Sequence, residues 1–266
     1  MNRIQERFGR LAKDARKGLV VYIGAGDPDL DHTRKLAIAM DKAGADVLEL
    51  GVPFSDPLAD GLVNQLAAQR GLASGATPAG ILDCVAQIRA ESQIPIVLYV
   101  YYNLIHRFGP RQFIERAAKA GVDGLLVLDL PPEESSQYVG WMDASGLCPI
   151  FLIAPTTPDS RIDTIVRHAS GFIYYVSREG VTGMQTSVSA DIGSMISRIR
   201  RHTSLPIAVG FGISSPEQAR AVAAKADAVV VGSAVVNRIA RAGADPAMVE
   251  KVAGFVGELS RAVKSV

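Results

Sequence analysis

A short apolar run followed by a longer amphipathic stretch recurs eight times along the 266 residues, and this repetition predicts a (β/α)8 (TIM) barrel. The apolar runs consist largely of Val, Ile and Leu without polar alternation, as expected of parallel strands that are covered on both faces. An open doubly wound sheet is the alternative. It is less favoured because the turn after the first run, GAGDP at residues 24–28, lacks the third glycine of the GxGxxG motif and contains a proline.

The expected elements alternate along the whole chain. The strands are expected at residues 19–23, 46–51, 96–101, 124–129, 149–153, 171–176, 206–210 and 228–232. Helices are expected between them, among others at 30–43, 78–91, 110–120, 132–145, 158–168, 190–202 and 216–224. A proline directly after Thr77, Thr157 or Ser215 marks three helix starts, and Gly44 and Gly121 mark two helix ends. The first 17 residues are predicted to form an extra N-terminal helix that closes the floor of the barrel.

Length and composition predict one domain, residues 1–266, of a reduced cytoplasmic protein. The hydrophobic share of 48% and the charged share of 21% are typical of a soluble globular chain. A net charge of +1 argues against a nucleic-acid partner, and no run of 18 apolar residues could span a membrane. The charged N-terminus is no secretory signal, and Cys84 and Cys148 form no CxxC motif.

In such a barrel, functional side chains belong at the carboxyl ends of the strands, and Glu49 lies near one of these ends. Period-two alternation places Val47, Glu49 and Gly51 on one face of the strand. Leu48 and Leu50 suit the helix-covered face, so the Glu49 carboxyl is expected to point into the barrel. Burial would raise the pKa of this carboxyl, which suits proton transfer. The alternative is a structural acid that is paired with an arginine or held by backbone donors.

Glycine-rich turns follow the last two strands, GFGISSP at residues 210–216 and GSA at 232–234. A phosphate held by the backbone of these two loops is a recurring feature of barrels, and simple turns are the alternative. The polar run SREGVTGM at 177–184 has the composition of a mobile lid or of an ordinary surface loop. Asp56 and Asp60 lie in a loop rich in Pro and Asp, where acids commonly face water.

The sequence lacks the residues that several kinds of catalysis require. No lysine lies in an expected strand, so Schiff-base chemistry is not expected. The four histidines form no HExxH motif and no triad, and no spacing of acidic residues singles out a metal site, so none is expected. Of the kinds of catalysis considered, the sequence supports acid–base chemistry by carboxylates on a small phosphorylated substrate.

Long motifs in chain order carry a resemblance to a known family. They are LELGVPFSDPLADG at 48–61, GDP at 26–28, DLPPEE at 129–134, APTTP at 154–158, SREGVTG at 177–183 and GFGIS at 210–214. Together they closely resemble the signature of the tryptophan synthase alpha subunit over the whole chain. The resemblance implies a lyase of L-tryptophan biosynthesis that performs the retro-aldol cleavage of indole-3-glycerol phosphate to indole and glyceraldehyde 3-phosphate.

The resemblance also implies residue roles. Glu49 would shuttle protons, Asp60 would accept a hydrogen bond from the indole N–H, and Tyr174 would lie near Glu49 in the active site. The substrate- and phosphate-binding positions implied are Tyr22, Thr182, Gly183, Phe211, Gly212, Gly232 and Ser233. Indole that is protonated at C3 is its own electron sink, so neither an imine-forming lysine nor a metal is required.

The resemblance further implies a partner, a beta subunit that carries pyridoxal phosphate in an alpha2-beta2 heterotetramer. Pro53, Asp56 and Pro57 would belong to the interface with this subunit. The chain itself is expected to carry no cofactor.

The chain departs from the family pattern at three places, two near the indole end of the pocket and one in the loop beyond Asp60. Tyr22 replaces a frequent Phe, Gly24 replaces a frequent Thr, and residues 62–64 read Leu-Val-Asn where Pro, a small residue and Ile are common. Two alternatives stay open beside the two-subunit synthase. One is a stand-alone indole-3-glycerol-phosphate lyase, and the other is an inactive barrel that only activates a beta partner. Another phosphate-binding barrel enzyme is a more distant alternative.

Overall fold

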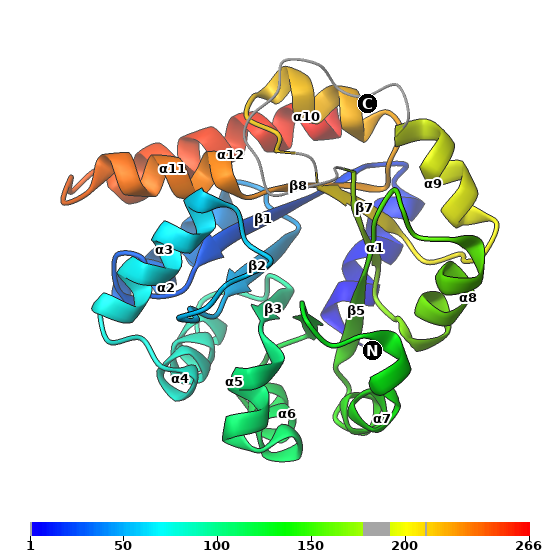
Figure 1. Ribbon diagram of the computed structural model, residues 1–266. Coiled ribbons are helices and arrows are strands. Elements are labelled where there is room, and N and C mark those ends of the chain that lie inside the picture. Colours follow the sequence, from blue (N-terminus) through cyan, green and yellow to red (C-terminus); the bar gives the residue numbers. More distant parts are fainter. Residues whose placement is uncertain (1, 178–191, 211) are drawn as a thin grey trace.

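The protein was analysed as a computed structural model that describes residues 2–177, 192–210 and 212–266. Its strands are β1 (Gly18–Gly24), β2 (Val47–Gly51), β3 (Ile96–Val100), β4 (Gly124–Val127), β5 (Cys148–Ile153), β6 (Ile173–Val176), β7 (Ile207–Gly210) and β8 (Ala228–Val231). Each strand pairs in parallel with its neighbours in the chain, and β8 pairs with β1 to close the barrel (Figure 1). The (β/α)8 barrel predicted from the sequence is confirmed.

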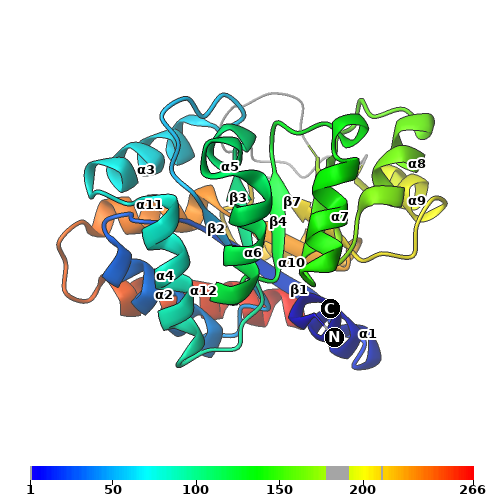
Figure 2. The same cartoon turned by 90° about the horizontal axis from the view of Figure 1, so that it is seen from below.

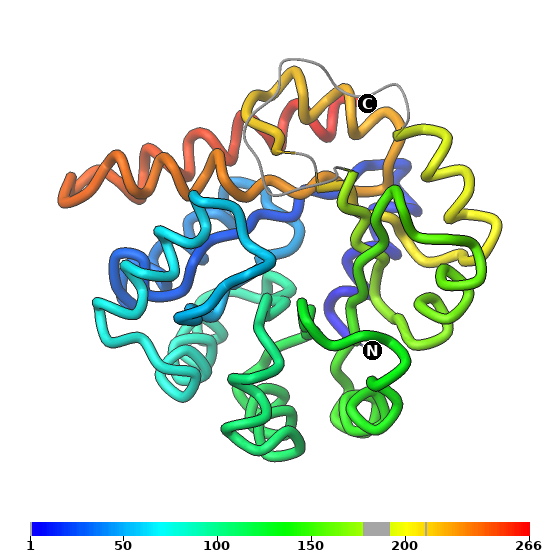
Figure 3. The backbone as a smooth tube through the Cα atoms, in the orientation of Figure 1, coloured from blue at the N-terminus to red at the C-terminus, as the bar shows by residue number. Residues whose placement is uncertain are grey.

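Helices surround this barrel (Figure 1). They are α1 (Arg3–Lys13), α2 (Leu30–Lys42), α3 (Leu62–Ala73), α4 (Pro78–Arg89), α5 (Tyr102–Phe108), α6 (Pro110–Ala120), α7 (Ser136–Ala144), α8 (Asp159–His168), α9 (Ile192–Arg200), α10 (Pro216–Ala223), α11 (Ser233–Ala242) and α12 (Met248–Lys264), with a short 3-10 helix η1 (Pro132–Glu134). The chain runs once around the barrel in order, so that its last helix packs beside α2 (Figure 3). In the described ranges no helix is both long enough and apolar enough to cross a bilayer.

The two faces of β2 separate as its alternation predicts. Val47 belongs to the apolar cluster inside the barrel, whereas Leu48 and Leu50 belong to the cluster between the strands and the outer helices. Glu49 and Gly51 therefore share the inner face with Val47.

Helix α1 closes the barrel at the end where the strands begin. Its buried side chains, Ile4, Phe8 and Leu11, join the inner apolar cluster from below. Asn2 caps this helix by accepting a hydrogen bond from the Ile4 N–H at 2.9 Å, and its amide donates to the Asp123 carbonyl at 2.7 Å. Figure 2 shows α1 at the end of the barrel opposite the loop that follows β2. The predicted floor helix is confirmed.

A buried carboxylate holds this floor together. Asp123 is 2% exposed and pairs with Arg89 at 2.8 Å and with Arg3 at 2.9 Å. It also accepts the Ile96 N–H at 2.8 Å, where β3 begins. A single side chain thus connects α1, α4 and two strands at the end of the barrel away from the strand termini that carry function.

Replacing Asp123 with Ala is expected to lower the free energy of unfolding by about 3–5 kcal/mol, because a buried guanidinium loses its counter-charge. Urea unfolding followed by circular dichroism measures the change. The matched control is Glu115→Ala, which removes an exposed i,i+4 pair with Arg111 and is expected to cost about 0.5 kcal/mol or less. Equal effects of the two substitutions would contradict this role of Asp123.

The structure differs from the expected elements in a few places. The strand expected to reach residue 101 ends at Val100, because Tyr101 is the N-cap of α5. The helix expected at 132–145 is divided into η1 and α7, and α8 begins at Asp159 with Pro158 as its N-cap. No prediction named α3, which buries the small residues Ala67 and Gly71 and exposes leucines, so its apolar pattern is not that of an ordinary amphipathic helix.

Candidate active site

Glu49 lies on β2 with its side chain inside the barrel, where it is 1% exposed. Its Oε1 atom is buried and has no hydrogen-bond partner among the described residues. Burial, followed by the negative charge of Asp60, raises the pKa of Glu49 to about 8. A carboxyl with this pKa is mostly protonated at neutral pH, so it can donate a proton and then take one back. No arginine among the described residues forms an ion pair with it.

Asp60 lies at the end of the loop that follows β2, and it is also buried. Its Oδ1 accepts the hydroxyl of Tyr99 at 2.8 Å and, more weakly, the amide of Asn64 at 3.5 Å, while Oδ2 accepts the hydroxyl of Tyr101 at 2.8 Å. Burial raises the pKa of Asp60, and the three donors oppose this increase. Because Glu49 lacks such donors, the two environments push the pKa values apart, and Asp60 is the first of the pair to ionise.

The position of Asp60 depends on α3, which begins two residues later. The Arg70 guanidinium on this helix forms a bidentate ion pair with buried Asp27, with both N–O distances 2.8 Å. The Ser74 hydroxyl donates to the Gly26 carbonyl at 2.9 Å. The loop that carries Asp60 is therefore held by β2 at one end and by the turn after β1 at the other.

Two further tyrosines, Tyr22 on β1 and Tyr174 on β6, face the two carboxyls. A Cβ at Gly51 would overlap the Tyr22 ring, and one at Gly210 would lie 2.8 Å from the Tyr174 hydroxyl. Glycine at these two strand ends therefore makes room for the rings. Burial and then the charges of the two carboxyls raise the pKa values of both tyrosines, so that their hydroxyls stay protonated at neutral pH.

The predicted phosphate-binding end lies beside this group. Gly232 is the N-cap of α11, next to Tyr22, and the helix begins at Ser233 without a side-chain cap. The Val235 and Val236 N–H groups donate to the Gly232 carbonyl, which leaves those of Ser233 and Ala234 without a partner in the described part of the chain. Free N–H groups at a helix start are a favourable place for an anion.

Not every predicted binding residue can be placed. Gly212 lies just after β7. Thr182, Gly183 and Phe211 lie outside the described residues, and so does the run 177–184, interpreted as a lid or a surface loop, except for Ser177.

The predicted interface residues lie in the loop between β2 and α3. Pro53 is buried against α3, Asp56 is exposed, and Pro57 is partly exposed. Two leucines on the same segment are unusually exposed, Leu58 by 88% and Leu62 by 68%. Large exposed apolar side chains in one segment are typical of a surface that another molecule covers.

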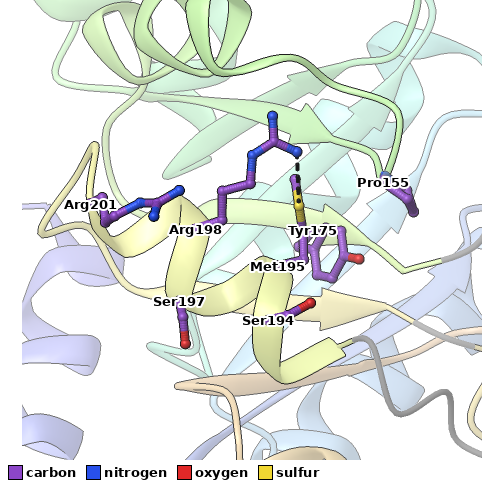
Figure 4. A pocket seen from close by; sticks show the side chains of 7 residues that line it. All are labelled: Pro155, Tyr175, Ser194, Met195, Ser197, Arg198 and Arg201. Carbon is purple, nitrogen blue, oxygen red and sulfur yellow. Dashed lines mark hydrogen bonds between the residues drawn. The ribbon is translucent and has the colours of Figure 1, made fainter.

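A small cavity beside Asp60 has mainly aromatic and apolar walls, which include Tyr22, Phe54, Tyr99 and Tyr101. A larger groove of about 420 Å3 lies outside the barrel between Pro155, Tyr175 and α9, and none of the predicted site residues that the structure describes lines it (Figure 4). Within residues 2–177, 192–210 and 212–266, no group of three or more His, Cys, Asp or Glu side chains could hold a metal ion.

Comparison with known proteins identifies the family. The model of the tryptophan synthase alpha chain family matches residues 8–264. The tryptophan synthase alpha chain of Opitutus terrae is 51% identical over 99% of this chain and 100% of the relative, and that of Citrifermentans bemidjiense is 49% identical over 99% and 98%. The chain belongs to the tryptophan synthase alpha chain family. Among solved structures, subunit alpha from Legionella pneumophila is similar with a TM-score of 0.90 and 36% identity, with 100% of both chains covered.

Members of the tryptophan synthase alpha chain family are lyases that catalyse the alpha reaction of tryptophan synthase, the cleavage of indole-3-glycerol phosphate. The family resemblance expected from the motifs is therefore confirmed, and with it the enzyme class.

The sequence analysis did not single out two members of this tryptophan synthase alpha chain site, Tyr99 and Tyr101. A signal was present, because two tyrosines at i and i+2 at the end of a strand lie on the same face. It was not recognised because the partner of both hydroxyls, Asp60, was interpreted from spacing alone as a loop acid.

Proposed function

We propose that the chain carries out the alpha reaction with Glu49 as its proton-transfer residue, Asp60 as the acceptor for the indole N–H, and Tyr174 beside Glu49. The observation that carries the proposal is the buried Glu49 carboxyl, which has an oxygen without a partner among the described residues and faces a second carboxylate that three donors hold. A pair of carboxyls in such different environments can act as an acid and an ion at the same pH.

In the first step, protonated Glu49 gives its proton to C3 of the indole. The ring becomes a cation whose charge is shared with N1. The Asp60 carboxylate accepts the N1–H hydrogen bond and stabilises this charge, which a water-excluded site makes more effective.

In the second step, the Glu49 carboxylate takes the proton from the hydroxyl on the side-chain carbon bonded to C3. The C–C bond breaks, its electrons restore the neutral indole, and the side chain leaves as an aldehyde, glyceraldehyde 3-phosphate. Glu49 returns to its protonated state, so the protons balance within one turnover. Both steps use only this chain's carboxyls and the electron-accepting indole, and we infer that the chain needs no cofactor of its own.

The phosphate of the substrate would bind at the start of α11. Its oxygens would accept hydrogen bonds from the N–H groups of Ser233 and Ala234, and Gly212 after β7 is a second candidate from the resemblance. Gly183 is a further candidate from the resemblance. Because a Cβ at Gly232 would lie 3.4 Å from the Tyr22 Cβ, this arrangement would place the phosphate at one end of the aromatic pocket and the indole at the other.

The partner would be a beta subunit that carries pyridoxal phosphate, in an alpha2-beta2 heterotetramer. The exposed Leu58 and Leu62, next to Asp56 and Pro57, support this part of the proposal. We also place the protein in the cytoplasm, where the buried free thiols of its two cysteines would stay reduced.

Indole release from indole-3-glycerol phosphate tests the proposal, measured with and without a beta subunit from a related bacterium. We expect activity that the beta subunit increases several-fold. No indole release, even with the beta subunit present, would overturn the proposed function. Equal rates with and without it would favour the stand-alone lyase.

The pH dependence of the same assay tests the role of Glu49. The free enzyme must hold Glu49 protonated for the first step, so kcat/KM is expected to fall about ten-fold per pH unit above the Glu49 pKa of about 8. A profile that stays flat up to about pH 10 would contradict Glu49 as the proton donor.

A further inference from the structure

Tyr99 lies beside the candidate active site, and the proposed reaction gives it no role. It lies on β3, two residues before Tyr101, and the strand period brings both side chains to the inner face. Both hydroxyls reach the same carboxylate. Tyr99 donates to Oδ1 of Asp60 and Tyr101 donates to Oδ2, each at 2.8 Å.

This geometry favours one ionisation state of Asp60. An ionised carboxylate can only accept hydrogen bonds, so two hydroxyl donors stabilise it, and bonds to a charged group are stronger than neutral ones. In the described part of the chain no salt bridge reaches Asp60. Hydroxyl groups rather than a cation therefore offset the cost of burying this charge.

The hydrogen bonds from Tyr99 and Tyr101 still leave Asp60 an acceptor position for the substrate. A carboxylate has about four lone-pair sites. Oδ1 accepts from Tyr99 and Asn64, whereas Oδ2 accepts from Tyr101 alone among the described residues. The Tyr101 hydroxyl also accepts the Ala59 N–H at 3.0 Å, so Tyr101 fixes the loop as well as the carboxylate.

Tyr99 differs from Tyr101 in what its ring does. Its ring packs edge to face against Tyr22, with centroids 5.1 Å apart and planes at 71°. Both rings line the cavity beside Asp60. Tyr99 therefore connects the charged group to the aromatic wall. The effect of removing its hydroxyl can be measured separately from the effect of removing its ring.

We propose that Tyr99 is a positioning residue for the alpha reaction, whose hydroxyl holds the Asp60 carboxylate ionised and oriented towards the indole N–H. This inference rests on the proposed function. The titratable side chains that face Asp60 are Glu49 from β2, Tyr22 from β1, Tyr99 from β3, Tyr101 directly after β3, and Tyr174 from β6. Of these, only Tyr99 and Tyr101 donate directly to Asp60 in the described structure.

The test is Tyr99→Phe, which removes the donor and keeps the ring. Without this hydrogen bond the Asp60 pKa rises, and the reaction needs Asp60 ionised. The acid limb of the kcat/KM profile is therefore expected to move up by about one pH unit. At a pH on that limb the rate falls about ten-fold, through kcat more than through KM, and the loss is smaller on the plateau.

Two further variants make the result decisive. Tyr138→Phe removes another buried hydroxyl, on α7 and without a partner among the described residues, and it is expected to leave the profile unchanged. Tyr99→Leu, which also removes the ring, should show the same shifted acid limb together with a larger KM. A wild-type profile for Tyr99→Phe, with Asp60→Asn still impaired, would overturn the inference and leave the proposed function intact. A wild-type enzyme that releases no indole would instead remove the proposed function itself.

Discussion

Replacing Glu49 with Gln is expected to reduce kcat for indole release by about 10³- to 10⁴-fold, near the upper end for general acid–base catalysis. The expected loss is large because the same carboxyl acts twice, as the donor to C3 and as the acceptor from the side-chain hydroxyl. Gln occupies nearly the same volume but can do neither. The measurement is indole formation by the purified chain with a beta subunit present.

A matched control separates this loss from a general effect of removing a glutamate. Glu91→Gln changes an exposed acid after α4 that pairs with Arg34, and it is expected to keep wild-type activity. If the assembled complex cleaved the substrate equally well with Gln at position 49, the chain would act as an inactive barrel that only activates its partner.

Glu49→Gln is also expected to change how the stability of the fold depends on pH. Relative to the wild type, the variant should be more stable at alkaline pH than at acid pH. Burial raises the Glu49 pKa to about 8 from its usual 4.5, so between these values the folded chain holds a proton that the unfolded chain has released. The wild type therefore loses stability as pH rises from 4.5 to about 8, and Glu49→Gln does not. Urea unfolding of both proteins at several pH values should show a difference that grows through this window and is constant above it.

The sequence predicted the barrel because the signals for it are local and repeated. Each strand is a run of Val, Ile and Leu, and glycine caps such as Gly121, in the left-handed conformation at the end of α6, separate it from the helix before. Helix α3 was not predicted because it buries Ala67 and Gly71 against the barrel and exposes leucines. Whether small residues pack closely depends on the residues of the neighbouring element. The hydrophobic periodicity of the helix itself carries no information about them.

The site was predictable where a single residue breaks a pattern. Glu49 is an acid inside an apolar strand, and alternation alone indicates which way it points. Asp60 is different, because its burial depends on Tyr99 and Tyr101, about 40 residues further along the chain. Spacing alone therefore favoured a solvent-facing loop acid, and only the family resemblance indicated otherwise.

Replacing Asp60 with Asn is expected to lower kcat by about 10²- to 10³-fold, which is typical when an electrostatic contact to the transition state is lost. The amide keeps the shape, but it has no charge to stabilise the indole cation, and its NH2 group would meet a hydroxyl donor, Tyr99 or Tyr101. Asp83→Asn, at an exposed position of α4, is the matched control and is expected to behave as wild type. Equal rates for the two variants would contradict the role of Asp60.

Two readouts distinguish loss of this charge from simple misplacement of the loop. The negative charge of Asp60 is the second cause that raises the Glu49 pKa, so Asp60→Asn should move the alkaline limb of the pH profile below about 8. A substrate methylated on the ring nitrogen cannot donate to Asp60. Methylation and substitution should therefore be strongly non-additive, because each removes the same hydrogen bond. Additive losses, with the alkaline limb unmoved, would show that Asp60 acts on the loop rather than on the indole N–H.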